Sequence, residues 1–243
     1  RGGSAFATFF GLSLTSGLAL AADEALDLTG FYWATEYHAT IQPVGGGELP
    51  FTPEGRAVYE RNMAGLEDGS IVDAARKFCT PDGPARSLAT PYPFQIVQEP
   101  PGQVLILHEL NHMIRAVQLD QPLPSFEDVL VVPWHNGHSV GHYEGDTLVI
   151  ETIGFNEVTL LDATGTPHSD QLVTMERVRK ISPTELEIAI NIHDPPYYTE
   201  DWQARFVYEV RNDVRIHDYV CGLGYRDISH IPGVEEARAA RRQ

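Results

Sequence analysis

Positive charge is scarce in this chain of 243 residues. Only Lys77 and Lys180 are lysines, and 17 basic residues stand against 34 acidic ones, so the formal net charge is −17. Such an anionic chain repels both the backbone of nucleic acids and the surface of anionic membranes. Nucleic acid is therefore not expected among its partners.

Charge of either sign is missing between Arg1 and Asp23. A basic start, an apolar run and the small-x-small triplet at residues 19–21 are typical of a secretory signal peptide, which residues 1–21 would form. The alternative is an uncleaved membrane anchor over residues 5–22, which is long enough to reach the lower limit for a membrane span. Both interpretations place the body outside the cytoplasm, either in the periplasm or secreted.

Cysteine is nearly absent, since Cys79 and Cys221 are the only two. Metal ligation by cysteine is not expected without a C-x-x-C pair. In the oxidising compartment of an exported protein, two cysteines commonly pair. We therefore expect a disulfide between Cys79 and Cys221, and two buried free thiols are the alternative.

The P-loop and the G-x-G-x-x-G signature of nucleotide-binding proteins are missing as well. Ser139 does lie in a literal G-x-S-x-G match, the nucleophile motif of serine hydrolases. That motif requires a strand, a turn and a helix in a parallel sheet, whereas β-type sequence continues after Ser139. The order of elements therefore argues against a serine hydrolase.

What the chain does contain is enough apolar sequence for a sizeable core, because 42% of its residues are hydrophobic. Residues 22–92 begin with a strand candidate and continue as a Pro- and Gly-rich loop. This loop holds one polar helix candidate, from Thr52 to Leu66. Thr52 is a favourable N-cap for it, and Pro53 suits the first helical position.

In the rest of the chain, short β-rich runs are separated by turn residues. Turns are expected at residues 99–102 and 182–184, and apolar side chains alternate strictly over residues 186–192. Together with the strand candidate at residues 28–37, the pattern predicts about nine strands with turns between neighbours. They would form a mainly β, up-and-down antiparallel barrel with its core over residues 93–230, followed by a tail at residues 231–243. A β-sandwich is the alternative.

Residues 108–112 read His-Glu-Leu-Asn-His, which matches the H-E-x-x-H motif of zinc metalloproteases. On a helix, this match would place His108 and His112 on one face as zinc ligands. However, the run follows a turn, is rich in β-branched residues, and lacks a third ligand at the spacing of such proteases. We favour two strands with a tight reversal and no cofactor, with zinc at His108 and His112 as the alternative.

Four segments occur in the order "PYPFQIVQEPPGQVLILHELNHMIRAVQLD", "GHSVGHYEGDTLVIETIGFN", "GTPHSDQLVTMERVRKI" and "DPPYYTEDWQARFVYEV". Together they resemble a large family of exported bacterial proteins, mostly without assigned function. The resemblance covers residues 27–226 and implies a lipocalin-like β-barrel. In that family the region of residues 108–112 looks like a strand pair whose first histidine position is often another residue, which implies a hairpin here.

Histidines and carboxylates are the candidates for chemistry. Residues 152–170 form a connection long enough to act as a lid over a barrel mouth. We also expect five residues to converge on a pocket as proton-transferring groups. These are His112, His138, His168, Asp162 and Glu176.

Each of these residues also has a purely structural interpretation. Histidines often bind backbone carbonyls, Glu176 has arginines beside it in the sequence, and Asp162 suits a turn. Four aromatic residues at strand ends and in loops are expected to bind a ligand, with ordinary core packing as their alternative. These are Trp134, Phe155, Tyr198 and Trp202.

Taken together, the sequence predicts an exported barrel that binds a small, partly apolar molecule. The favoured activity is that of a cofactor-free lyase, isomerase or dehydratase that works by acid–base catalysis. The alternatives are a non-catalytic binding protein, an extrinsic subunit of a membrane complex held by residues 5–22, and a zinc metalloprotease.

Overall fold

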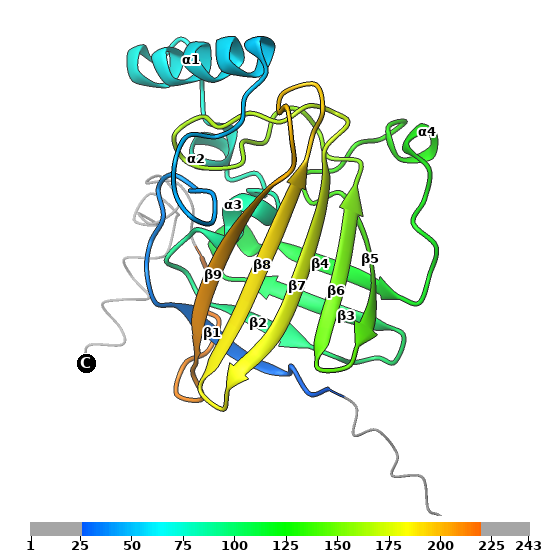
Figure 1. The fold of residues 1–243 in the computed structure, drawn as a ribbon. Helices are drawn as coiled ribbons and strands as arrows, with labels where there is room; N and C mark the ends of the chain where they lie inside the picture. The colour runs from blue at the N-terminus through cyan, green and yellow to red at the C-terminus, as the bar shows by residue number, and fades with distance from the viewer. Residues whose placement is uncertain (1–25, 220–243) are drawn as a thin grey trace, which may run out of the picture.

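A computed structural model describes residues 26–219, which form a closed barrel of nine strands with short helices around it (Figure 1). Neighbouring strands follow one another in chain order, and β1 pairs with β9 to close the barrel. The strands are β1 (Gly30–Ala34), β2 (Phe94–Val97), β3 (Gln103–His108), β4 (Ile114–Leu119), β5 (His138–Glu144), β6 (Thr147–Ile153), β7 (Val173–Ser182), β8 (Glu185–His193) and β9 (Trp202–Val210). The prediction of a mainly β barrel with about nine strands is confirmed, whereas its lipocalin identity is not.

One strand pair corrects the predicted topology. β4 and β5 are parallel, so the barrel is mixed and not fully antiparallel as expected. The cause is the connection over residues 120–137, which contains the short helix α4 (Phe126–Val129) and returns the chain to the end where β4 begins. Parallel neighbours require such a long crossover, whereas a hairpin would have made the pair antiparallel.

β1 corresponds to the strand candidate that precedes the predicted barrel core, and it is part of the barrel wall. It pairs with β2 through residues 30–32 and with β9 through residues 32–34. In the described part of the chain, the barrel therefore begins at Gly30 and its last strand ends at Val210.

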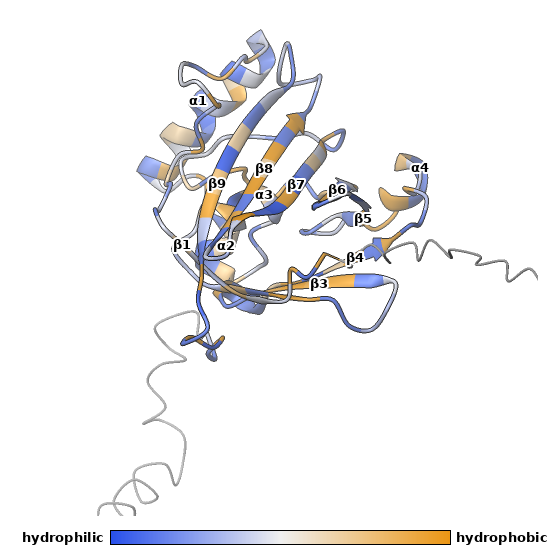
Figure 2. Cartoon of the chain, turned by 60° about the horizontal axis from the view of Figure 1, so that its bottom comes forward, coloured by the Kyte–Doolittle hydropathy of each residue, from blue (hydrophilic) through white to orange (hydrophobic). Residues whose placement is uncertain are grey.

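The predicted alternation of apolar residues builds the core. Leu186, Ile188, Ile190 and Ile192 on β8 are all buried inside the barrel. On β9, the side chains on the inward face are Trp202, Ala204, Phe206 and Tyr208, which are also buried. Figure 2 shows hydrophobic and hydrophilic residues alternating along these two strands, as expected when one face of a sheet is buried.

The helices gather mainly at one end of the barrel (Figure 1). α1 (Pro53–Asp68) begins as predicted, with the Thr52 hydroxyl accepting a hydrogen bond from the Gly55 backbone N–H at 3.0 Å. α2 (Ala74–Phe78) follows, and then α3 (Pro84–Leu88), whose five residues are all buried. Leu88 belongs to the hydrophobic core, and its carbonyl accepts a hydrogen bond from the Tyr208 hydroxyl inside the barrel. α3 therefore plugs this end of the barrel.

The His-Glu-Leu-Asn-His segment forms a reversal between two strands. β3 ends at His108, the single 3₁₀ turn η1 (Leu110–His112) follows, and β4 starts at Ile114. Asn111 and His112 adopt positive φ values of 54° and 48°, which are incompatible with a continuous right-handed helix. The predicted hairpin is confirmed, and the helix that a metalloprotease requires does not form.

Some predictions concern residues outside the described part of the chain. The proposed signal peptide (residues 1–21) and the C-terminal tail (residues 231–243) lie there. The disulfide is not shown by the structure, because Cys221 also lies outside the described residues. Within residues 26–219, no helix is long and apolar enough to cross a membrane.

Candidate functional site

Glu176, a predicted catalytic residue, lies inside the barrel in a buried ion pair. Its side chain is fully buried on the inward face of β7, with Thr174 and Val178 on the same face. The guanidinium of Arg115 on β4 reaches across the interior and lies 2.8 Å and 2.9 Å from the two carboxylate oxygens. Glu176 is therefore held as the counter-ion of Arg115, not of the neighbouring arginines that the sequence suggested.

Two hydroxyl groups complete the surroundings of this pair. Arg115 Nε donates to Ser139 Oγ at 2.9 Å, and Arg115 Nη2 donates to Thr152 Oγ1 at 2.7 Å. The two hydroxyl oxygens lie 2.9 Å apart, within hydrogen-bond distance of each other. Ser139 is thus part of a buried polar network in the middle of a strand. The nucleophile elbow that the sequence motif would require is not formed.

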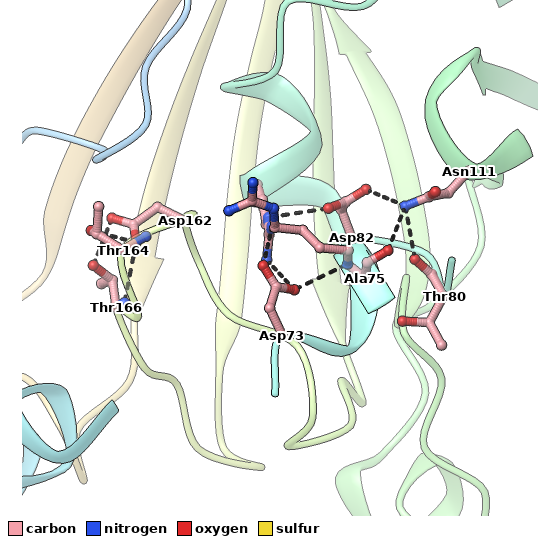
Figure 3. Close-up of polar contacts among 10 residues, drawn as sticks. Asp73, Ala75, Thr80, Asp82, Asn111, Asp162, Thr164 and Thr166 are labelled. Atoms are coloured by element: carbon pink, nitrogen blue, oxygen red, sulfur yellow. Dashed lines mark hydrogen bonds and ion pairs between the residues drawn. The ribbon is translucent and has the colours of Figure 1, made fainter. Parts of the chain in front are cut away.

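Asp162 anchors the long connection between β6 and β7. Its carboxylate is fully buried and accepts hydrogen bonds from the backbone N–H groups of Ile41, Thr164 and Thr166, and from the hydroxyls of Thr164 and Thr166. Figure 3 shows Asp162 with the two threonines. With five donors around it, Asp162 acts here as a structural anchor of the connection.

His168 lies in the same connection and is also bound on both sides. Its Nδ1–H donates to the Ser169 carbonyl at 2.9 Å, and its Nε2 lies 2.6 Å from the Thr159 hydroxyl. Burial lowers the pKa of the His168 ring, although the hydrogen bond to Ser169 opposes this shift. The neutral ring then accepts from Thr159, and both nitrogens are occupied within the protein.

His108 and His112 point to different environments. His108 is buried on the inward face of β3 against Phe94, with ring centroids 5.3 Å apart. Burial and the nearby Arg115 charge lower the pKa of His108 to about 3. His112 is exposed, and its Nε2 accepts a hydrogen bond from the Tyr219 backbone N–H at 3.0 Å. This arrangement does not fit a zinc site, and residues 26–219 contain no group of three or more metal-ligating side chains.

His138 is the one predicted catalytic residue that lies on a large pocket. It occupies the outward face of β5, half-buried, and its ring stacks on Trp134 with centroids 4.6 Å apart and an interplanar angle of 27°. Trp134 is 54% exposed, although its backbone is fixed by hydrogen bonds with Gly154 and Asn156 beyond the end of β6. The Trp134–His138 pair therefore forms a stacked aromatic wall whose backbone is held at Trp134.

The pocket arises because β4 and β5 separate. They pair only through residues 117–119 and 139–141, and toward the start of β4 the side chain of Asn136 bridges to the Ile114 carbonyl instead. Figure 1 shows that β4 runs across the barrel while β5 runs nearly upright. The resulting seam pocket has a volume of about 640 Å³, and its walls include Ile114, Ala116, Pro133, Trp134, His138 and Val140.

The exposed surface of the seam pocket is mainly apolar, although the side chains of Gln118, Gln121 and Asn136 also line it. Ser139 and Arg115 reach it from the barrel interior, but their donors are engaged in the network with Glu176 and Thr152. His135 also lines it, and partial burial lowers the pKa of this histidine. The pocket is thus suited to an apolar ligand with one or two polar atoms.

The other three aromatic residues predicted to bind ligand belong to the core. Phe155 and Tyr198 are 2% and 3% exposed, and Trp202 is 5% exposed inside the barrel. Tyr198 donates its hydroxyl to the Pro167 carbonyl at 2.7 Å, and burial raises its pKa strongly. These three residues therefore pack in the core, as the alternative interpretation had it, and do not line a ligand pocket.

Sequence reasoning missed Arg115 and most of the seam pocket. The parity of β4 places Met113, Arg115 and Val117 on one face, so an inward arginine was detectable before the structure. Its partner could not be predicted, because Glu176 lies 61 residues further along the chain. The five predicted catalytic residues do not converge: two lie outside the barrel wall, two anchor the connection, and one is paired inside.

Comparison of the chain with models of known protein families and with curated proteins gives no match. The family suggested by the sequence motifs is therefore not confirmed, and the barrel itself is what the structure establishes.

Proposed function

We propose that this protein binds a small, largely apolar molecule with a flat ring in the seam pocket between β4 and β5. The observation that carries the proposal is the stacked Trp134–His138 wall beside a pocket of about 640 Å³. Aromatic rings stack favourably on such a wall, and pockets of this size are typical of sites for small ligands. Ile114 and Val132, which are 65% and 63% exposed, add apolar surface in the same region.

The geometry favours binding over acid–base catalysis as the main role. Glu176 is paired with Arg115, and Asp162 and His168 have their polar atoms bound within the protein. One observation keeps catalysis as a second candidate: His135 and His138 both line the seam pocket. A neutral imidazole at this place is able to accept a proton from a bound ligand.

We also propose export as the setting of this function, with residues 1–21 as a cleaved signal peptide. Attachment to a membrane through residues 5–22 is the alternative, and it would suit an extrinsic subunit. Mass spectrometry of the mature N-terminus distinguishes the two, because cleavage removes Arg1.

The binding proposal is tested by titration with N-phenyl-1-naphthylamine, a neutral aromatic probe whose fluorescence rises in apolar sites. We expect saturable binding of one probe per chain. Trp134→Ala removes one wall and is expected to weaken binding about tenfold, or ~1.4 kcal/mol. The matched control is Trp33→Ala, a partly exposed tryptophan on β1 that does not line the pocket.

A second variant tests the same pocket by filling it. Ala116 is exposed on the pocket wall, so Ala116→Trp introduces a ring into the space without touching the core. We expect this variant to exclude the probe. Equal affinity of Trp134→Ala, Ala116→Trp and the unchanged protein would refute the proposal.

A further inference from the structure

A second cleft lies at the end of the barrel that α3 plugs, and no residue lines both this cleft and the seam pocket. Its volume is about 330 Å³. Asp82, Arg86 and Asn111 lie at its base, and Tyr37, Tyr92 and Tyr219 stand around it. We refer to it as the polar cleft.

The base of the polar cleft is a buried, ordered set of charged side chains. Arg86 and Asp82 are 6% and 4% exposed, and Arg86 Nε lies 3.1 Å from Asp82 Oδ1. Asp73 binds the same guanidinium through both oxygens, at 3.0 Å and 2.7 Å. Asn111 Nδ2 donates to Asp82 Oδ2 at 2.9 Å and to the Thr80 carbonyl at 3.0 Å (Figure 3).

These internal contacts leave both hydrogen-bond donors and hydrogen-bond acceptors available to a ligand. Asp73 accepts hydrogen bonds from two of the five N–H groups of Arg86, and Asp82 lies beside a third as an ion pair. The other two N–H groups have no hydrogen-bond acceptor among residues 26–219. Asn111 Oδ1 is buried and accepts no hydrogen bond from residues 26–219. Burial also raises the pKa of Asp82, although Arg86 and Asn111 oppose the shift. A buried acceptor without a donor costs about 1–3 kcal/mol unless something binds it.

Charge and size narrow the class of ligand. Arg76, Arg86 and Asp82 line the cleft, and Asp73 binds Arg86 from behind the lining, so the two positive and two negative charges balance and neither an anion nor a cation is favoured. The volume lies at the lower end of ligand pockets. The aromatic rings offer flat apolar surface, and Tyr92 and Tyr219 already meet edge to face at 5.3 Å.

We propose that the polar cleft binds a neutral molecule with several hydroxyl groups, about the size of a single sugar ring. Its hydroxyls would accept from Arg86 and donate to Asp82 or Asn111, while its C–H faces would pack against the tyrosines. This site is independent of the ligand proposed for the seam pocket.

Saturation-transfer difference NMR with the methyl glycosides of glucose, galactose, mannose and N-acetylglucosamine tests the proposal on the full chain. We expect transfer to at least one of the four. Asp82→Asn is expected to abolish it, whereas the control Asp213→Asn removes an exposed ion pair of Arg211 that lies outside the cleft and preserves it.

Tyr37→Ala is a second variant, which tests the cleft even when Asp82→Asn does not fold. Tyr37 is 52% exposed on the cleft rim, so its truncation leaves the core intact and is expected to reduce transfer several-fold. Transfer to none of the four glycosides, or transfer that both Tyr37→Ala and Asp82→Asn leave unchanged, would overturn the proposal. Neither result bears on binding of the naphthylamine probe in the seam pocket.

Discussion

Arg115 and Glu176 stand out among single residues, because each is a charge placed inside a packed apolar barrel. Their side chains are 4% and 1% exposed, and each is the other's counter-ion. Removing one partner from such a pair leaves an uncompensated buried charge. Replacing both partners by apolar residues leaves no buried charge. The hydroxyls of Ser139 and Thr152, which contact Arg115, lie close enough to form a hydrogen bond with each other.

We therefore predict that Glu176→Gln lowers the free energy of unfolding by about 3–5 kcal/mol. The double variant Arg115→Met with Glu176→Leu should recover most of that loss. Urea denaturation of the three proteins measures both effects. A double variant less stable than Glu176→Gln would contradict the assignment of the pair.

His108 makes a separate prediction, for stability in acid. Its pKa is about 3 in the native barrel and near 6.5 in the unfolded chain. Between these values the unfolded chain binds a proton that the native protein does not, so stability falls as pH decreases from 6.5 toward 3. The contribution of His108 to the change in the free energy of unfolding approaches ~1.4 kcal/mol per pH unit. Burial of His168 acts in the same direction.

Replacement of His108 by Phe removes this contribution and retains a ring against Phe94. We expect the variant to lose less stability than the unchanged protein between pH 7 and pH 4 in urea titrations. The control is Val44→Phe, which adds the same ring at a residue that is 61% exposed and has no titrating group, so it should leave the slope unaltered. Parallel pH profiles for all three proteins would contradict the prediction.

At the scale of elements, the connection between β6 and β7 covers one end of the barrel through two buried carboxylates. Asp162 binds five donors from Ile41, Thr164 and Thr166. Asp194 accepts from the Ser169 N–H at 2.7 Å and from its hydroxyl at 2.5 Å. These contacts describe a fixed cover, not the mobile lid suggested by its length alone.

We predict that Asp162→Ala loosens the cover without opening the barrel. Hydrogen–deuterium exchange should rise over residues 159–169, while β7, β8 and β9 keep their protection. Thr164→Val, which removes only one of the five donors, is the milder control. Uniform exchange across cover and strands would mean that the cover is an inseparable part of the barrel core.

Features of the fold that depend on local sequence patterns were predictable, whereas those that depend on long-range pairing were not. The helix from Thr52 and the alternating face of β8 depend on local patterns, so the sequence was sufficient to predict them. The parallel β4–β5 pair depends on the path of residues 120–137, which carry no regular pattern. The seam pocket follows from that pairing, so only Trp134 and His138 among its walls were identified in advance.

At the scale of the whole molecule, contacts bring the chain after β9 back to the region of α2. Tyr219 N–H donates to His112 Nε2, and the neighbouring Asn111 donates to the carbonyl of Thr80, next to Cys79. Cys221 follows Tyr219 by two residues. Tyr219 therefore lies in the region of Thr80, and the disulfide between Cys79 and Cys221 stays a prediction.

The expected disulfide is tested by peptide mapping without reduction, which should yield one linked peptide with both cysteines. Closing so long a loop typically stabilises a protein by about 2–4 kcal/mol, so reduction should lower the melting temperature. The double variant Cys79→Ser with Cys221→Ser should melt at the temperature of the reduced protein and be insensitive to reductant. Two free thiols under non-reducing conditions would rule the bond out.

We propose that the separation of β4 from β5 creates a binding site for an apolar ring. The most direct measurement is a crystal structure of the protein soaked with N-phenyl-1-naphthylamine. We predict density for the probe against Trp134, between Ile114 and His138. A probe found only elsewhere on the molecule, or a seam pocket left unoccupied at saturating concentration, would contradict the claim.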